Sequence, residues 1–345
     1  MVPRLALVTG GSGYLGSVLV RRLLGRGYRV RVLDLRDADD RPAGVEFVRG
    51  DIRAGAEVAR ACEGADVVHH GVAQVPLAKD SRLFRSVNVD GTRTLLACAR
   101  RAGVRKTVLV SSSAVYGAPE RNPVTEATPA RPGEAYGAAK LEGERVAADF
   151  VQRGMDVTIV RPRTILGHGR LGLFQVLFEW TRRGRPLWVL GRGDNRYQFV
   201  HADDLADACI LAGERAGPAS YNIGAERFGT MREALETLAR HAGTGSRVRS
   251  LPVGIAVRLM ALSGRLGLSP LGPYHALMYG REMYFDVTAA REDLGWRSTA
   301  SNEEMLCESY DWYLAHHEEV LARRDASPHR SAVRHGVLDL LGYLP

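Results

Sequence analysis

A glycine-rich turn near the start of the chain limits its possible folds more than any other segment. Residues 9–16 have the sequence T-G-G-S-G-Y-L-G, after a short apolar run and at the start of a stretch with apolar residues at helical spacing. In a strand–turn–helix unit, such glycines let backbone N–H groups approach a pyrophosphate at the positive end of the helix. A glycine pattern alone is weak evidence in a chain with 38 glycines, but this position makes it specific. The turn predicts a dinucleotide site with cofactor contacts from Gly10, Gly13, Tyr14, Leu15 and Gly16.

Short β-branched runs alternate with helical patterns along the first half of the chain. Strands are predicted at 5–8, 28–33, 45–48, 67–70, 108–111 and 157–160, and helices at 14–26, 84–101 and 136–153. Strands that alternate with helices form parallel sheets covered on both faces. We therefore expect a doubly wound α/β fold of the Rossmann type.

The pattern changes after residue 161, where Gly and Pro become more frequent. A helix is predicted at 174–183, with brief strands at 187–190 and 221–223. We expect three regions: a dinucleotide-binding domain of residues 1–165 with returning segments around 197–225, a smaller substrate-binding part of residues 166–196 and 226–320, and a C-terminal extension of residues 321–345.

Composition narrows the class of protein. The 345 residues are 45% hydrophobic and 25% charged, which is the ordinary balance of a soluble globular protein. The net charge of +8 is scattered along the chain, which disfavours a nucleic-acid platform and suits an anionic small molecule. The longest apolar stretch, 251–268, is interrupted by two arginines, so we expect no membrane span.

The four cysteines and the first residues of the chain bear on its compartment. The cysteines lie far apart and form no C-x-x-C pair, so neither a zinc knuckle nor a disulfide framework is predicted. The first apolar run is too short for a signal peptide. A reducing cytoplasm fits best. His69 and His70 are adjacent on a predicted strand and point to opposite faces, so we expect no metal site there.

An aspartate at the end of the second predicted strand bears on the choice of dinucleotide. Asp34 lies 18 residues after Gly16, where a carboxylate accepts both hydroxyls of an adenosine ribose and repels a 2′-phosphate. NAD is therefore favoured over NADP. Arg36 argues the other way, because an arginine there could accommodate the phosphate. The alternative role of Asp34 is to begin a polar turn.

A tyrosine and a lysine four residues apart form the candidate catalytic pair. Tyr136 and Lys140 share one face of a predicted helix. A lysine ammonium and an oxidised nicotinamide can both stabilise a phenolate, and lowering a tyrosine pKa by about three units takes roughly 4 kcal/mol. The serines at 111–113 directly follow a strand, at the sheet edge where doubly wound folds bind ligands. A serine there can hold the reacting oxygen while tyrosine moves its proton.

Together these motifs resemble the extended short-chain dehydrogenase/reductase family, in its NAD-dependent epimerase/dehydratase branch. The resemblance covers residues 4–315 and rests on the glycine turn, Asp34, 50–52, 66–74, Asn88, 111–117, Tyr136 with Lys140, 161–162, 199–204 and 294–296. It implies NAD as cofactor, Ser112 as the catalytic serine, Asp51 and Ile52 as adenine contacts, and Asn88 as a buried support. It also implies a homodimer paired through the helices at 84–101 and 136–153.

Departures from the family pattern concern the substrate. The 4,6-dehydratases of the family carry an Asp-Glu pair where this chain has Ser113 and Ala114, so dehydration is disfavoured. Thr164 replaces the usual Asn of the nucleotide-sugar members, and residues 197–199 replace their Arg-Asp-Phe, so a nucleoside diphosphate grip is in doubt. Five arginines could replace it: Arg163, Arg170, Arg192, Arg196 and Arg281. The candidate substrate contacts are Ser113, Tyr116, Thr164, Arg196 and Arg281.

Three functional hypotheses follow. The first is an NAD-dependent oxidoreductase that epimerises a secondary alcohol of a sugar-like substrate, possibly a nucleotide sugar, through hydride transfer and a transient ketone. The second is a net dehydrogenase or ketoreductase of the 3β-hydroxysteroid dehydrogenase type. In that case residues 251–268 would line a lipid-like pocket instead of forming a buried or lid helix. The third is a non-catalytic NAD-binding module, which an intact Ser112, Tyr136 and Lys140 set argues against.

Overall fold

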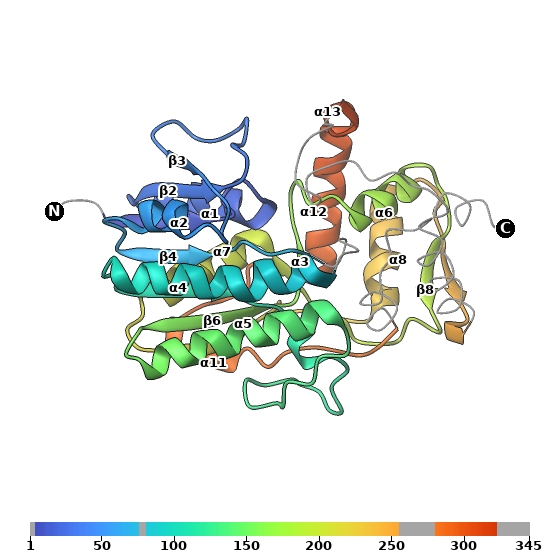
Figure 1. Cartoon of the computed structure of the whole chain (residues 1–345). Helices are drawn as coiled ribbons and strands as arrows, with labels where there is room; N and C mark the ends of the chain where they lie inside the picture. Colours follow the sequence, from blue (N-terminus) through green and yellow to red (C-terminus); the bar gives the residue numbers. More distant parts are fainter. Residues whose placement is uncertain (1–3, 76–80, 255–279, 323–345) are drawn as a thin grey trace.

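The chain folds around a seven-stranded parallel sheet. The structure, a computed structural model, describes residues 4–75, 81–254 and 280–322 (Figure 1). The strands are ordered β10-β6-β5-β4-β1-β2-β3, so that β1 lies inside the sheet and the later strands continue to one side of it. This order confirms the predicted doubly wound fold. The strands are β1 (Leu5–Thr9), β2 (Arg29–Asp34), β3 (Glu46–Arg49), β4 (Val67–His70), β5 (Lys106–Val110), β6 (Val157–Pro162) and β10 (Ala219–Ile223).

Helices cover both faces of this sheet. On one face lie α1 (Tyr14–Gly25) and α7 (Ala202–Glu214); on the other lie α2 (Gly55–Cys62), α4 (Thr92–Arg101) and α5 (Ala135–Gln152). Successive residues of a strand point to opposite faces, so Ala6 and Val8 of β1 enter one hydrophobic core and Leu7 enters the other. Figure 1 shows α4 and α5 side by side along the sheet.

The predicted strands agree with the observed ones to within a few residues, whereas the helix predicted at 84–101 is wrong in its internal structure. This region consists of α3 (Ser81–Arg85), a π-helical turn over Ser86–Gly91, and α4. The turn places the Asn88 side chain inward. Its amide oxygen accepts from the backbone N–H of Gln74, and its amide nitrogen donates to the backbone carbonyl of Gln74. A π turn inserts an extra residue into a helix, and apolar periodicity does not reveal it.

The rest of the chain builds a second, smaller group of elements. It contains α6 (Leu173–Arg182), β8 (Leu187–Leu190), α8 (Met231–Ala242), β11 (Val248–Leu251), α12 (Asn302–Ala315) and α13 (His317–Ala322). Helices α6, α8 and α12 pack on one another around Phe178, Leu238 and Tyr310, at the end of the molecule away from the N-terminus (Figure 1). All four tryptophans of the chain follow residue 166: Trp180, Trp188, Trp296 and Trp312.

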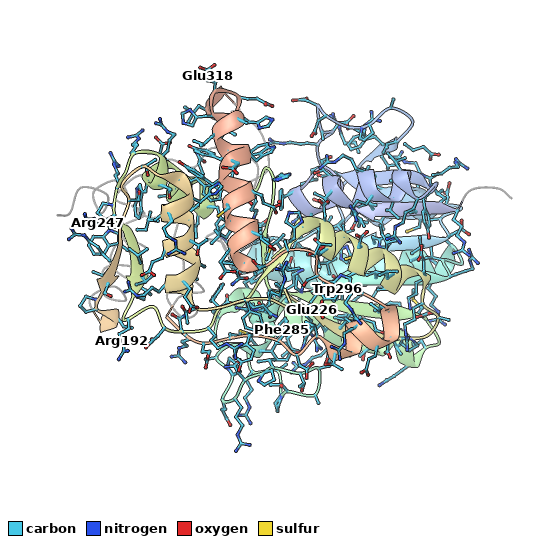
Figure 2. All side chains as sticks on the ribbon, turned by 180° about the vertical axis from the view of Figure 1, so that it is seen from behind. Arg192, Glu226, Arg247, Phe285, Trp296 and Glu318 are labelled. Atoms are coloured by element: carbon cyan, nitrogen blue, oxygen red, sulfur yellow. The ribbon has the colours of Figure 1, made fainter. Side chains whose placement is uncertain are left out.

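Short segments join these elements to the main sheet. Strands β7 (Thr164–Leu166) and β9 (Phe199–His201) pair in parallel, and α11 (Thr288–Leu294) lies against β10. Seen from behind, Phe285 and Trp296 lie on the segment that runs between the two groups, while Arg192 and Arg247 lie at the far edge (Figure 2).

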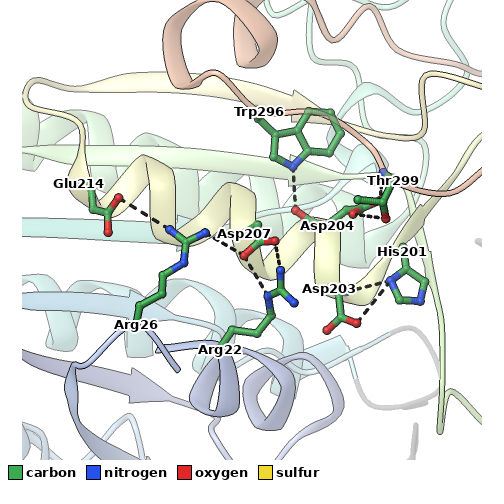
Figure 3. Close-up of polar contacts among 9 residues, drawn as sticks. All are labelled: Arg22, Arg26, His201, Asp203, Asp204, Asp207, Glu214, Trp296 and Thr299. Atoms are coloured by element: carbon green, nitrogen blue, oxygen red, sulfur yellow. Dashed lines mark hydrogen bonds and ion pairs between the residues drawn. The ribbon is translucent and has the colours of Figure 1, made fainter. Parts of the chain in front are cut away.

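Helix α7 is held by contacts from α1 and from the segment after α11 (Figure 3). Arg22 of α1 forms a two-point ion pair with Asp207, and the Trp296 Nε1–H donates to the carbonyl of Asp204 at 2.8 Å. His201 caps the helix, since its Nδ1 accepts from the N–H of Asp203 at 3.3 Å. His201 therefore has a structural role at the start of α7.

Two sequence predictions fall on other parts of the chain. Most of the apolar stretch 251–268 and nearly all of the extension 321–345 lie outside the described residues. Within the described ranges, no helix has the length and apolar character needed to cross a membrane.

Candidate active site

The glycine turn is packed too tightly to accept side chains. Gly10 has φ +76°, and a Cβ on it would lie 3.0 Å from the backbone nitrogen of Val72. At Gly16, a Cβ would lie 2.0 Å from the carbonyl oxygen of Gly10. Gly13 is the N-cap of α1, so no side chain covers the first turn of that helix from this position. Bare backbone N–H groups at a helix N-terminus fit the pyrophosphate of a dinucleotide.

Asp34 lies directly beside this turn. It ends β2, and its Oδ2 accepts a hydrogen bond from the backbone N–H of Ser12 at 3.1 Å. Burial raises the pKa of Asp34, and the Ser12 hydrogen bond opposes that rise. Arg36 is exposed two residues further on. The Asp34 carboxylate thus lies against the glycine turn, and its contact with an adenosine ribose stays a prediction.

The other candidate cofactor residues lie just after β3 and in the π-helical turn. Asp51 forms an ion pair with Arg53 at 2.6 Å, so its carboxylate already has a partner. Ile52 is buried, and it fills the space that a side chain at Gly91 would need. Asn88 holds the backbone of Gln74, as described above. A support role for Asn88 agrees with these contacts.

The three candidate catalytic residues meet at the ends of β5 and α5. Ser112 lies two residues after β5 and caps a short 3₁₀ turn (Ser113–Tyr116) by accepting from the N–H of Ala114 at 3.2 Å. The Ser112 side chain lies near that of Tyr136 and lowers the pKa of the phenol. Lys140, one helical turn further along α5, donates from Nζ to the carbonyl of Val110 at 3.0 Å. Lys140 is therefore anchored to the strand that leads to Ser112.

Burial sets the charge state of this pair in the protein by itself. Burial raises the pKa of Tyr136 to about 12, although Ser112 and the charge of Arg170 lower it. Burial also lowers the pKa of Lys140 to about 8, and the Glu144 carboxylate opposes that fall. The neutral phenol is therefore favoured, and stabilisation of the phenolate by Lys140 together with an oxidised nicotinamide stays a prediction.

Two glutamates of this region had no predicted role. Glu134 is the N-cap of α5, and its carboxylate accepts from the N–H groups of Tyr136 and Gly137 at 2.7 and 2.6 Å. Glu144 binds Arg161 through two hydrogen bonds of 2.9 and 2.7 Å. Glu144 lies four residues after Lys140, so helical spacing could have placed it on the catalytic face.

The candidate substrate residues fall into two groups. Tyr116 is buried, and its hydroxyl is occupied by Arg161 at 2.8 Å and Asn222 at 2.9 Å, so its contacts are those of a packing residue. Ser113 is also buried and accepts from Arg163 at 3.1 Å. The Thr164 hydroxyl lies 2.8 Å from that of Tyr197.

The other two candidates are exposed arginines on the second group of elements. The Arg196 guanidinium lies over the rings of Phe228 and Tyr284, at 4.9 and 4.3 Å from their centroids. The carbonyl of Arg281 accepts from the Asn195 side chain at 3.3 Å. Within the described ranges, these contacts of Arg196 and Arg281 are to residues other than Ser112 and Tyr136.

The two adjacent histidines of β4 are buried in the sheet. Burial lowers the pKa of His69 to about 4 and that of His70 to about 3. The His70 ring lies between the hydroxyls of Thr9 and Thr92, at 2.7 and 3.1 Å. Among the described residues, no cluster of three or more His, Cys, Asp or Glu side chains could hold a metal ion.

Comparison with known proteins identifies the relationship. The family model described as the NAD dependent epimerase/dehydratase family matches residues 6–224. An uncharacterised protein of Sinorhizobium fredii, y4nG, is 50% identical over 99% of this chain and 86% of its own length.

Relatives of known activity are more distant. A UDP-glucose 4-epimerase of Mycolicibacterium smegmatis is 31% identical over 89% of this chain and 97% of its own. A 3β-hydroxysteroid dehydrogenase/Δ5→4-isomerase of Mycobacterium tuberculosis is 31% identical over 91% of each chain. Among solved structures, the UDP-glucose 4-epimerase of Thermotoga maritima with UDP-glucose aligns with a TM-score of 0.77 and 25% identity, over 90% of this chain and 99% of that one.

Proposed function

The chain belongs to the NAD-dependent epimerase/dehydratase family, and from this premise we propose that it epimerises a secondary alcohol of a sugar-like substrate. One observation carries the proposal: Ser112 lies close enough to Tyr136 to lower the pKa of the phenol, and Lys140 is one turn away on the same helix. NAD is the cofactor of the family, and the bare glycine turn with Asp34 beside it fits that dinucleotide.

Each residue of the site has a distinct part in this reaction. Tyr136 takes the proton of the substrate hydroxyl as the alcohol is oxidised and returns it when the ketone is reduced. Ser112 donates a hydrogen bond to the same oxygen. Lys140 supplies positive charge, because at neutral pH a lysine with a pKa of about 8 is still mostly protonated. The glycine turn and Asp34 would hold NAD, which would supply the acceptor and donor of the hydride at the substrate carbon.

The role of Tyr136 can be tested with a single substitution. We expect Tyr136→Phe to lower turnover by about 10²–10⁴-fold, because the group that moves the proton is lost. The affinity for NAD, measured by titration calorimetry, should change less than about threefold, since the glycine turn and Asp34 are untouched. A variant that keeps the wild-type rate would refute the assignment.

A second candidate is net dehydrogenation of a hydroxysteroid-like alcohol. Its support is the relative among 3β-hydroxysteroid dehydrogenases, together with Thr164 in place of the usual nucleotide-sugar asparagine. Purified protein that interconverts UDP-glucose and UDP-galactose without added NAD supports epimerisation. Strict dependence on added NAD, with a 3-ketosteroid accumulating from a 3β-hydroxysteroid, supports the dehydrogenase instead.

The assembly and location of the protein remain predictions. By resemblance, we expect a homodimer paired through α4 and α5, and the widely spaced cysteines favour the cytoplasm. The division of the chain into residues 1–165 with 197–225, and 166–196 with 226–320, is proposed from the change of sequence pattern after residue 161.

A further inference from the structure

One arginine beside the candidate catalytic residues is buried without a carboxylate partner. Arg163 follows β6 and is only 2% exposed. Its Nη1 donates to the Ser113 hydroxyl at 3.1 Å and contacts the Met283 sulfur at 3.2 Å. Its Nε and Nη2 have no hydrogen-bond partner among the described residues. These two nitrogens form one side of the planar guanidinium, here called the open edge of Arg163.

Other arginines of this protein show what that edge usually binds. Two residues earlier, Arg161 uses Nε and Nη2 to hold both oxygens of Glu144, at 2.9 and 2.7 Å, and its Nη1 donates to the Tyr116 hydroxyl. Arg182 holds Glu179 through the same two nitrogens. Arg163 repeats the arrangement of Arg161, with Nη1 on a hydroxyl, but its open edge has no carboxylate.

Such an arrangement is costly in a protein interior. A buried cation without a counter-ion loses its hydration and gains no ion pair in return. The rings of Tyr197 and Phe285 lie 4.9 and 5.6 Å from the guanidinium carbon, and these contacts offset part of the loss. They do not supply hydrogen-bond acceptors to Nε and Nη2. A ligand that does so would complete the site.

Arg163 reaches the turn that carries the proposed catalytic serine. Its Nη1 donates to Ser113, which is adjacent in sequence to Ser112, and Ser112 lies close enough to Tyr136 to lower the pKa of the phenol. We propose that Nε and Nη2 of Arg163 bind a carboxylate of the substrate, which is therefore an acid whose carboxylate lies close to the oxidised alcohol carbon. This inference rests on the proposed function for the catalytic roles of Ser112 and Tyr136.

A carboxylate matches this edge better than a phosphate does. The two parallel N–H groups of a guanidinium edge fit the two oxygens of a planar carboxylate. The single charge of Arg163 balances one negative charge, whereas a phosphate monoester carries nearly two. The edge is shielded from solvent in this conformation, so an incoming carboxylate must displace a neighbour. The flexible thioether of Met283 is the group most able to shift.

The test uses the full chain with NAD and a small carboxylate as the probe. Thermal unfolding midpoints are measured in sodium acetate and in sodium chloride of equal ionic strength, with acetamide as a neutral match in shape. We expect acetate to raise the wild-type midpoint by about 2 °C or more over chloride, and acetamide to leave it unchanged. Arg163→Met should lose this response. Arg131→Met, which removes an exposed arginine paired with Glu120, should keep it.

Stability in chloride separates binding from a structural role. Arg163→Met breaks no ion pair, so its midpoint in chloride should equal or exceed that of the wild type. A wild type that responds equally to acetate and chloride, or an Arg163→Met that still responds to acetate, would overturn the proposal. A larger, Arg163-dependent response to inorganic phosphate than to acetate would also overturn it, in favour of a phosphate site.

A second variant covers the case in which Arg163→Met does not fold. Arg163→Lys keeps the charge but lacks the two parallel N–H groups, so its acetate response should fall to less than about half. In ¹⁵N-arginine spectra, the Nε–H signal of Arg163 is identified as the one that is missing from Arg163→Lys. This signal should shift when acetate is added to the wild type, and a signal that does not move contradicts the proposal. Tyr136→Phe should keep the acetate response, so a failure of the proposed catalytic role remains distinguishable from a failure of this site.

Discussion

The Tyr136 hydroxyl is buried beside that of Ser112, and burial raises its pKa to about 12. Removing that proton at pH 7 costs about 7 kcal/mol, so positive charge in the assembled site must offset most of this. Arg170 already lowers the pKa of Tyr136, and Lys140 is charged only below a pH of about 8. In the proposed reaction, Tyr136 would therefore need further positive charge near the phenol, such as an oxidised nicotinamide would bring.

Asp34 should decide between the two nicotinamide dinucleotides. Asp34→Asn keeps the shape of the side chain but removes the charge that binds ribose hydroxyls and repels a 2′-phosphate. We expect the ratio of NAD affinity to NADP affinity to fall by about tenfold or more, as measured by calorimetry. Asp37→Asn, which alters an exposed carboxylate paired with Arg41, is the matched control. An unchanged ratio in Asp34→Asn would contradict the ribose contact.

His69 should make the protein sensitive to mild acid. Its pKa is about 4 in the folded chain and about 6.5 when unfolded, so the unfolded state takes up the proton first as the pH falls. The resulting loss in the free energy of unfolding begins below pH 6.5 and reaches about 2 kcal/mol at pH 5. Urea unfolding is measured at pH 7 and pH 5. Between these two pH values, the free energy of unfolding of His69→Leu should fall by about 2 kcal/mol less than that of the wild type. Equal losses in both proteins would show that His69 does not titrate this way.

The spacing of residues along the sequence predicts some residues of the site and gives no information on others. Tyr136 and Lys140 are four apart on one helix, and Ser112 follows a strand, so their proximity follows from local geometry. The open edge of Arg163 has no such signal, because it depends on which side chains fail to reach it in three dimensions. The burial that raises the pKa of Tyr136 is likewise a property of packing and not of spacing.

At the scale of elements, the turn before α1 brings backbone atoms so close together that no side chain fits at Gly16. A methyl group at Gly16 would lie 2.0 Å from the Gly10 carbonyl, so Gly16→Ala must move the turn and the start of the helix. We expect NAD affinity to fall by about tenfold or more, since the pyrophosphate contacts come from that backbone. The measurement is a titration of NAD against the folded variant.

Gly25, at the other end of the same helix, provides the control. A Cβ there meets no atom within 4 Å, so Gly25→Ala should bind NAD as the wild type does and be slightly more stable. Equal affinities for Gly16→Ala and Gly25→Ala would show that the turn tolerates displacement.

The strands of the main sheet and helices α1, α5 and α6 were predictable as elements because their apolar residues repeat with a period of 2 or near 3.6. The π-helical turn of Ser86–Gly91 was not, since its extra residue is stabilised by contacts to Gln74 and to β4 through Thr92 and His70. Helices α8 and α12 were also absent from the prediction. Their apolar residues face a core that only the assembled second group provides.

For the whole molecule, the sheet depends on a strand from late in the chain. Strand β10 pairs with β6, with Tyr221 opposite Val160, and α7 covers one face with residues such as Leu205 and Ile210. A fragment of residues 1–165 therefore lacks an edge partner and half of one core. We expect it to show no cooperative thermal transition by circular dichroism, unlike the full chain. A fragment that melts cooperatively near the full-chain midpoint would show that the first 165 residues fold alone.

The distribution of tryptophan has a spectroscopic consequence. All four lie beyond residue 166, so the indole emission of this protein comes entirely from outside the segment that carries the glycine turn. Reduced nicotinamide absorbs in the range where indole emits. Nonradiative energy transfer between the two would therefore report, with no introduced label, how closely the late elements approach a dinucleotide on the early ones.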